Sequence, residues 1–370
     1  MTIAIGLTKK QSEPTRLYKQ PNLVNASLDA IGTRLAAYLT DRWGETQTIT
    51  DIEQIPGGAS RETYRVKLRG ADSEQGLILR RDPVSSLIDT ERALEYQTYV
   101  AVFPTEIPVP EPLVLEEDPK YLDRPFSVMR EITGCESDLA NLALPPYVDV
   151  RERIAEIKWS LLGKLATLDI DGLGITGFME TPAHPAAREL DYWAGVINED
   201  SLHPEPVAQA AIRWLEKNLP EPSGNLVLVH GDYRTGNFLY TETGDIEGIL
   251  DWEMAHIGDP LEDLAWSLDP LWSWPEQTLA GGLIPRADAI GIWAQTSGYR
   301  VDRRAFRWWQ IFASLKGLAI WISSTENFTN GVTKEPILAV AGWLMTDRQN
   351  RILVDRLNPD SPHQYAEPVL

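Results

Sequence analysis

The sequence HGDYRTGN, from His230 to Asn237, carries the strongest local pattern in this chain. It lies between two short apolar segments, Leu226 to Val229 and Phe238 to Tyr240. A third apolar segment, Ile246 to Leu250, leads directly into Asp251. Short apolar runs bounded by turn-forming residues are typical of buried strands. We therefore predict three short strands that present the polar residues of this region from their ends.

The polar residues of this region have the spacing of a kinase catalytic loop, because Asp232 and Asn237 form an Asp-x-x-x-x-Asn pattern. Phosphoryl transfer needs a carboxylate that accepts the hydroxyl proton, and oxygen ligands that hold magnesium. We predict that Asp232 is the base and that Asn237 and Asp251 are the metal ligands. His230 is the second candidate catalytic residue, and we expect it to brace the loop by hydrogen bonding. Each residue alone is better explained as a turn former, but their order between apolar strands favours the catalytic interpretation.

A family resemblance extends this pattern. With Gly258-Asp259-Pro260 and Asp263-Leu264-Ala265 further along, the motif resembles the aminoglycoside phosphotransferase and choline kinase superfamily. The resemblance is weaker but present from Ile49 to Gly134. It implies an α+β, bilobal protein-kinase-like fold, with a small antiparallel-sheet N-lobe and a larger, mainly helical C-lobe. It also implies ATP, or GTP, bound with Mg²⁺ between the lobes, the base and metal ligands given above, and a loop brace at Asp263.

The spacing of apolar and turn residues divides the chain in the same way. Helical periodicity is expected over 27–43 and 86–103, and strands over 48–55, 62–68, 77–80, 112–115 and 126–130. Longer amphipathic helices are expected over 150–168, 206–219, 303–323 and 338–353. We therefore predict a lead-in over 1–26, a nucleotide-binding N-lobe over 27–133, and a catalytic and substrate-binding C-lobe over 134–370.

Two N-lobe segments are candidates for nucleotide contact. Gly57, Gly58 and Ser60 lie in a turn that could bring backbone N–H groups near phosphate oxygens, although a Gly-Gly pair is more often an ordinary hairpin turn. The strand over 126–130 resembles the one that leads into the interlobe hinge. Backbone groups of Glu131, Ile132 and Thr133 would then face the adenine edge. Met129 would line the adenine pocket, with a plain core role as the alternative.

Arg80 stands where a kinase strand carries its phosphate-binding lysine, and Arg81 competes for the role. Glu95 is the candidate ion-pair partner on the following helix, with Glu91 as the alternative. Arginine can bind phosphate through its planar guanidinium, but it is not interchangeable with lysine. The substitution resembles the kinase-like domains attached to some acyl-CoA dehydrogenases. Weakened phosphate binding is the other interpretation.

Composition argues against several other functions. The chain has 370 residues, 43% of them hydrophobic, which is enough for two compact units. Its formal net charge of −20 argues against nucleic-acid binding, which depends on clustered Lys and Arg. Cys135 is the single cysteine, so no intrachain disulfide can form. The apolar stretches are too short to span a bilayer. We therefore expect a soluble, cytoplasmic protein with no membrane partner.

Two features bear on the small-molecule hydroxyl acceptor, and they point to different compounds. Aromatic rings in an acidic chain could hold the cation of an amino sugar or amino alcohol, although core packing is the simpler explanation for each ring. An arginine cluster could hold the phosphates of a hydroxyacyl-CoA if its members share a helical face, with solvated charge as the alternative. The tryptophans are Trp252, Trp266, Trp272, Trp274, Trp293, Trp308, Trp309 and Trp321, and the arginines are Arg300, Arg303, Arg304 and Arg307.

Other classes of function are weaker interpretations. A protein hydroxyl as acceptor is disfavoured because no Ala-Pro-Glu signature follows Asp251. A nucleotide-binding pseudokinase or regulatory module would be marked by the loss of the base or a metal ligand, and this chain has candidates for both. The sequence leaves open the choice between ATP and GTP, the acceptor, and the oligomeric state.

Overall fold

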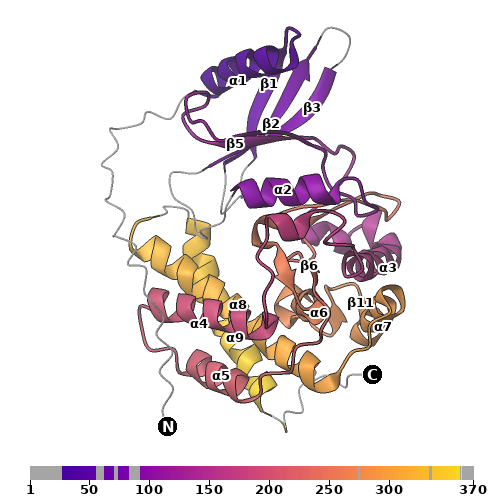
Figure 1. Ribbon diagram of the computed structural model, residues 1–370, viewed down its shortest axis with the longest axis vertical. Helices are drawn as coiled ribbons and strands as arrows, with labels where there is room; N and C mark the ends of the chain where they lie inside the picture. The colour runs from indigo at the N-terminus through magenta and orange to yellow at the C-terminus, as the bar shows by residue number, and fades with distance from the viewer. Residues whose placement is uncertain are drawn as a thin grey trace.

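The computed structural model describes residues 27–55, 62–70, 74–82, 92–273, 276–332, 336–358 and 360. Figure 1 shows a small sheet at one end of the molecule and a larger, mainly helical part at the other. The α+β class with a small antiparallel sheet ahead of a helical region is therefore confirmed. Among the described residues, no helix is long and apolar enough to cross a membrane.

The N-terminal sheet has five strands in the order β1-β2-β3-β5-β4, and all neighbours are antiparallel. Along β2, Tyr64, Val66 and Leu68 are buried while the residues between them face outward, which is the period-two pattern of a half-buried strand. The strands are β1 (Thr48–Ile55), β2 (Glu62–Arg69), β3 (Glu74–Arg81), β4 (Pro112–Glu116) and β5 (Phe126–Arg130).

Helix α1 (Leu28–Trp43) packs on this sheet and completes its apolar core. It begins where Ser27 accepts a hydrogen bond from the N–H of Ala30, and it ends at Gly44, whose φ of 75° suits a left-handed cap. Ile31, Leu35 and Leu39 lie on its buried face, at the spacing expected from the sequence.

Helix α2 (Arg92–Val102) lies between the sheet and the helical part (Figure 1). Tyr99 and Val102 belong to the larger apolar core, together with Met129 from β5. The ring of Tyr99 is 6.4 Å from that of Trp252 in an edge-on contact. The two parts of the molecule are therefore joined by shared apolar packing as well as by the chain.

The C-terminal part is built around α8 (Arg303–Thr329), which is buried on most sides between Phe306 and Ser324. A helix that is apolar all round belongs in the centre of a core. The other helices are α3 (Tyr147–Leu165), α4 (Pro185–Asp200), α5 (Pro206–Lys217), α6 (Pro260–Ser267), α7 (Arg286–Ser297) and α9 (Pro336–Leu357). The short strands are β6 (Val227–Val229), β7 (Phe238–Tyr240), β8 (Ile246–Ile249), β9 (His256–Gly258), β10 (Leu279–Ala280) and β11 (Ile284–Pro285).

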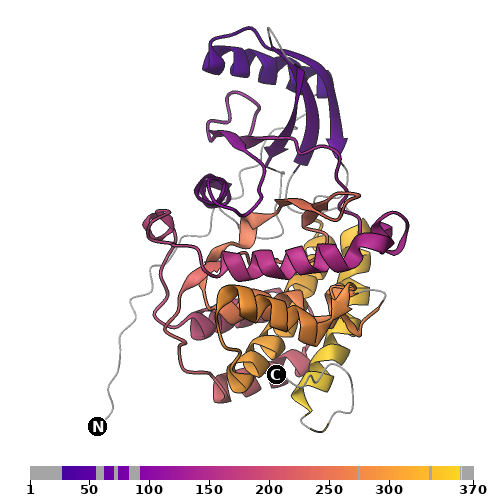
Figure 2. The same cartoon turned by 90° about the vertical axis from the view of Figure 1, so that its right-hand side faces the viewer.

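Helices α3 and α7 lie side by side (Figure 2), and they approach each other closely at Gly163 of α3. A Cβ atom at Gly163 would lie 2.7 Å from Thr296 Cβ and 3.0 Å from the carbonyl oxygen of Trp293. Because the second of these atoms is backbone, a side chain there would force the two helices apart.

We therefore predict that Gly163→Ala destabilises the protein by about 1–3 kcal/mol, the usual range for overpacking a tight contact. Gly195→Ala in α4 is the matched control, because nothing lies within 4 Å of a Cβ there. The control should be stabilising by about 0.5–1 kcal/mol, since alanine favours a helix over glycine. Urea unfolding measures both, and equal stabilisation by the two substitutions would contradict the close approach of α3 and α7.

Candidate active site

Two short strand pairs hold the candidate catalytic residues. β6 pairs with β9 and leads into His230, and β7 pairs with β8 and follows Asn237. Asp251 comes just after β8 and has φ 62° and ψ 59°. Left-handed backbone is uncommon for a non-glycine residue and is found preferentially at functional sites. The three strands expected around this motif are all present.

Three side chains orient the carboxylate of Asp232. Its Oδ1 accepts a hydrogen bond from Trp266 Nε1 at 2.9 Å, and its Oδ2 accepts one from Asn237 Nδ2 at 2.7 Å. Arg234 Nε lies 3.1 Å from Oδ2. Asp232 and Asn237 are therefore in direct contact, and the carboxylate has little freedom to turn.

His230 is buried and links the loop to the end of β8. Its Nε2 donates to the carbonyl oxygen of Leu250 at 2.9 Å, and its Nδ1 accepts from the N–H of Asp232 at 3.1 Å. This pair of contacts requires the neutral imidazole, with its proton on Nε2. Burial lowers the pKa of His230 from 6.5 to about 4, although the nearby Asp232 carboxylate opposes the shift. At neutral pH the ring therefore acts as an uncharged connector.

The start of the loop is held from two sides. The carboxylate of Asp263, in the first turn of α6, accepts the N–H groups of His230 at 2.6 Å and Gly231 at 3.0 Å. From α8, Lys316 Nζ donates to the carbonyl oxygen of Gly231 at 2.8 Å. All of these groups are buried. A buried backbone group left without a partner costs about 1–3 kcal/mol, so these contacts fix the peptide before Asp232.

Arg80 reaches across from β3 to the helical part. Its guanidinium contacts Glu95 Oε1 of α2 at 2.6 Å and Asp251 Oδ1 at 3.0 Å. Arg81 turns away and pairs with Glu62 at 2.6 Å. Of the two arginines expected to compete, only Arg80 faces Asp251, and it does so together with the glutamate expected on the next helix.

One backbone group of the expected hinge segment, which begins at Glu131, is already used within the sheet. The N–H of Glu131 donates to the carbonyl oxygen of Gly76 at 3.0 Å, so that donor is used by the sheet and does not face a base. The Glu131 side chain pairs with Arg65 at 2.6 Å. Met129 is buried in the larger core, and Ile132 lies close to Gly248.

The candidate turn of Gly57, Gly58 and Ser60 lies outside the described residues, as do Glu91 and Trp274.

A cavity of about 530 Å³ opens beside Asp232, and its walls are mainly apolar. Indole rings from four elements line it: Trp193, Trp266, Trp272 and Trp321. Polar groups are fewer: Arg234 is present, with the carboxylates of Glu199, Asp200 and Glu253. Trp193 was not singled out in the sequence. It lines the cavity because it lies on α4, a helix that was not predicted from the sequence. Trp252, Trp293, Trp308 and Trp309 are instead buried core residues.

A sequence profile of the phosphotransferase enzyme family matches residues 51–304, which is more than half of the chain. The chain belongs to this family.

The family assignment agrees with one curated relative and with the fold of solved structures. Acyl-CoA dehydrogenase family member 11 from Gallus gallus is 29% identical over 228 residues, covering 60% of this chain and 28% of that protein. A candidate aminoglycoside phosphotransferase from Ralstonia eutropha has a TM-score of 0.69 at 20% identity, covering 87% of this chain and 98% of its own. A choline/ethanolamine kinase family protein from Mesorhizobium loti has a TM-score of 0.55 at 17% identity, with 91% and 98% covered.

These comparisons confirm the resemblance drawn from the motif, including the resemblance to chains that carry an acyl-CoA dehydrogenase. This phosphotransferase spans about a third or less of the length of the curated relatives it matches. The likeness to the solved structures establishes the kinase-like fold.

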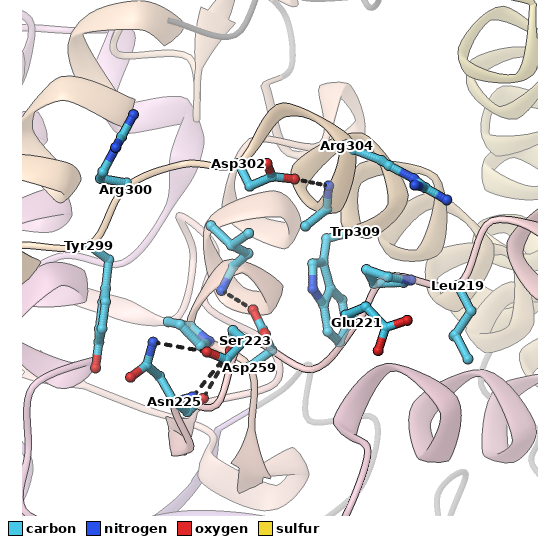
Figure 3. Close-up of a pocket in the computed structure, with 14 residues that line it drawn as sticks. Leu219, Glu221, Ser223, Asn225, Asp259, Tyr299, Arg300, Asp302, Arg304 and Trp309 are labelled. Atoms are coloured by element: carbon cyan, nitrogen blue, oxygen red, sulfur yellow. Dashed lines mark hydrogen bonds between the residues drawn. The ribbon is translucent and has the colours of Figure 1, made fainter.

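The arginine cluster does not lie at the cavity beside Asp232. Arg300 precedes α8, so the predicted shared helical face does not include it. Arg300 and Arg304 line a separate cavity of about 360 Å³ together with Asp259 and Trp309. Figure 3 shows the two guanidinium groups pointing in different directions, away from Asp259. The cluster therefore does not form one anion site next to the candidate base.

Behind the loop of this phosphotransferase, a buried ion network surrounds Lys316. Glu262 contacts Lys316 at 3.5 Å and His256 at 3.1 Å, and Glu189 lies 3.6 Å from His256. One ligand atom from each of Glu189, His256 and Glu262 falls within 4.8 Å of the others, a separation that a metal ion could bridge. Because Lys316 and the histidine already balance these carboxylates, we interpret the cluster as an ion network.

This network makes stability depend on pH through His256. Burial alone would lower the pKa of His256, but the carboxylates of Glu189 and Glu262 raise it from 6.5 to about 9. The protonated ring therefore contributes stability that is fully present below pH 6.5 and is lost as pH rises through 9.

We predict that the free energy of unfolding falls by at most about 3 kcal/mol across this window, at roughly 1.4 kcal/mol for each pKa unit. In His256→Gln this component of the decline should vanish, whereas His203→Gln at an exposed position should keep it. Urea unfolding at several pH values measures the difference, and identical pH dependence in wild type and His256→Gln would contradict the assignment.

Proposed function

We propose that this chain transfers the γ-phosphate of a magnesium-bound nucleotide, ATP in the first instance, to a hydroxyl group of a small molecule. One observation carries the proposal: the Asp232 carboxylate contacts Asn237 on one side and lines the indole-walled cavity on the other. A base that takes the hydroxyl proton must lie between the phosphate donor and the acceptor. These two contacts support Asp232 as that base.

The donor side offers oxygen ligands suited to magnesium. Asn237 uses its Nδ2 to contact Asp232, which leaves its Oδ1 facing away from that bond. Asp251 is half-exposed and uses Oδ1 toward Arg80, which leaves Oδ2. Carboxylate and amide oxygens are the hard donors that Mg²⁺ prefers, so Asn237 and Asp251 would hold it. Bound there, the ion would neutralise charge on the transferring phosphate.

Arg80 would bind the nucleotide phosphates from the sheet side. Its guanidinium is held by Glu95, so it is already directed toward Asp251. A planar guanidinium can contact two phosphate oxygens at once, which suits a fixed arginine better than a mobile one. We retain residues 27–133 and 134–370 as the two proposed lobes and place the nucleotide between them.

For the acceptor, we propose a compound with an apolar body, and hydroxyacyl thioesters as the first class to test. The cavity walls are mainly indole and aliphatic, and the matched relatives include acyl-CoA dehydrogenase family members. Amino alcohols are the second class, because Glu199 and Asp200 beside the rings would suit a cation. The arginine cluster does not favour either class, since it lines another cavity.

The decisive experiment measures magnesium-dependent phosphate transfer by the purified chain to hydroxyacyl-CoAs, amino alcohols and aminoglycosides, with mass spectrometry of the product. Asp232→Asn keeps the size of the side chain but cannot take a proton, and its single amide oxygen can replace only one of the two oxygens that accept from Trp266 and Asn237. We predict that it lowers turnover by a factor of about 10²–10⁴, the usual scale for general base catalysis, while nucleotide still binds.

Asp245→Asn is the control for this substitution, because it makes the same change at a surface carboxylate that pairs with Arg153 and lines no part of the cavity. Full turnover in Asp232→Asn would overturn the role of the base. Nucleotide binding without transfer to any acceptor would favour a regulatory pseudokinase.

A second prediction concerns the metal. Asp251→Ala should abolish the gain in nucleotide affinity that magnesium gives to the wild type, because it removes one of the two proposed ligands. Asp245→Ala is the matched control, since Asp245 pairs with Arg153 on the surface. Isothermal titration with and without magnesium measures the gain, and an unchanged gain in Asp251→Ala would exclude the metal role.

A further inference from the structure

Lys158 is a buried amine that neither the acid–base chemistry nor the metal site uses. It projects from α3, and only 1% of the residue is exposed. No carboxylate in the part of the chain that the structure describes forms an ion pair with it. Its neighbours are the rings of Trp159 at 4.5 Å and Phe238 at 5.4 Å. Burying an amine without a counter-charge is unfavourable, so its presence calls for a compensating role.

Lys158 contacts the catalytic loop at two points. Its Nζ lies 2.9 Å from Thr235 Oγ1, and its backbone carbonyl accepts the hydroxyl of Tyr233 at 2.6 Å. Tyr233 and Thr235 are buried and flank Arg234 in the sequence. These contacts therefore fall on the segment that separates Asp232 from Asn237.

The other side of this contact is closed by a turn. Gly281, between β10 and β11, has φ 54°, and its carbonyl oxygen lies 3.4 Å from Thr235 Oγ1. A Cβ atom at Gly281 would lie 2.7 Å from Thr235 Oγ1 and 2.9 Å from Lys158 Nζ. The glycine thus leaves room for the pair, and the site is closely packed around one hydrogen bond.

We infer that Lys158 is a positioning residue, which acts through Thr235 to hold the loop between the base and the metal ligand in its productive geometry. The inference rests on the proposed phosphotransfer function. Lys158 touches neither Asp232 nor Asn237, and its effect passes through the backbone of the loop. Misplacing a reacting group by about 1 Å can lower a rate by about 10²-fold, so a second layer of support has a measurable effect.

The electrostatics of the site disfavour the charged form of the amine. Burial, together with the positive charge of Arg234, lowers the pKa of Lys158 from 10.5 to about 7. Replacing this amine by an apolar side chain of similar length should therefore stabilise the fold. If Lys158 served only to stabilise the fold, the same replacement would destabilise the protein. The sign of the stability change therefore distinguishes a positioning role from a purely structural one.

The test compares Lys158→Met, Thr235→Val and the double variant with Lys164→Met. Lys164 is the matched control, because it lies on the same helix but pairs with Glu106 at the surface. We expect Lys158→Met to raise the melting temperature by about 2–4 °C, lower kcat by about 10- to 10²-fold, and leave the KM for nucleotide nearly unchanged. Thr235→Val should give the same loss of kcat, and the double variant should lose no more than either single variant.

Hydrogen exchange over residues 232–240 supplies a readout that does not need turnover. Faster exchange in Lys158→Met and Thr235→Val, but not in Lys164→Met, supports the inference even if no acceptor is found. Unchanged exchange and unchanged kcat in Lys158→Met overturn it, as do additive losses in the double variant. Absence of phosphate transfer in the wild type overturns the proposed function instead, and the exchange result then tests only whether Lys158 holds the loop through Thr235.

Discussion

The buried carboxylate of Asp263 is the constraint on which the rest of the site depends. It accepts two consecutive backbone N–H groups, those of His230 and Gly231, from a position in the first turn of α6. The pairing of β6 with β9 ends at Val229, so these two N–H groups have no partner in a neighbouring strand. Because they are buried, they need another acceptor. Asp263 therefore determines where the chain leaves the strand, and the position of Asp232 follows from it.

Support for the loop comes from elements that are far apart in sequence. Leu250 at the end of β8 holds His230, Lys316 of α8 holds Gly231, and Trp266 of α6 holds Asp232 itself. Trp266 also lines the cavity, and its ring lies 5.1 Å from Lys316 Nζ. Trp266 therefore both forms part of the cavity wall and holds the Asp232 carboxylate, so the shape of the cavity is coupled to the geometry of the loop.

The sheet contributes its part through a single buried arginine. Arg80 joins Glu95 of α2 to Asp251 of the helical part, and the N–H of Asp251 donates to the hydroxyl of Tyr99, also on α2. α2 therefore holds both the arginine and the aspartate. Any motion between the sheet and the helices must change this arrangement, so the proposed nucleotide site would respond to the placement of the sheet.

Local pattern was enough to predict the five strands of the N-terminal sheet, β6, β7 and β8, and the ion pair between Arg80 and Glu95, because each follows from short-range spacing or from the family resemblance. The very short strands β9, β10 and β11 were missed, because two or three residues carry too little pattern to mark a strand. Local pattern also failed where packing over long distances decides. The cavity needs Trp193 from α4, a helix that was not predicted from the sequence. The arginine cluster does not share one helical face, because α8 begins at Arg303 and leaves Arg300 outside it. Of the backbone groups of Glu131 to Thr133 that were expected to face the adenine edge, the N–H of Glu131 is already used by Gly76 of β3.

The most direct test of the central claim is a crystal structure of the chain with magnesium and a non-hydrolysable ATP analogue. We expect the metal to contact Asn237 and Asp251, Arg80 to contact the phosphates, and the terminal phosphate to face the cavity beside Asp232. A nucleotide bound away from these residues, or a metal held instead by Glu189, His256 and Glu262, would contradict the claim.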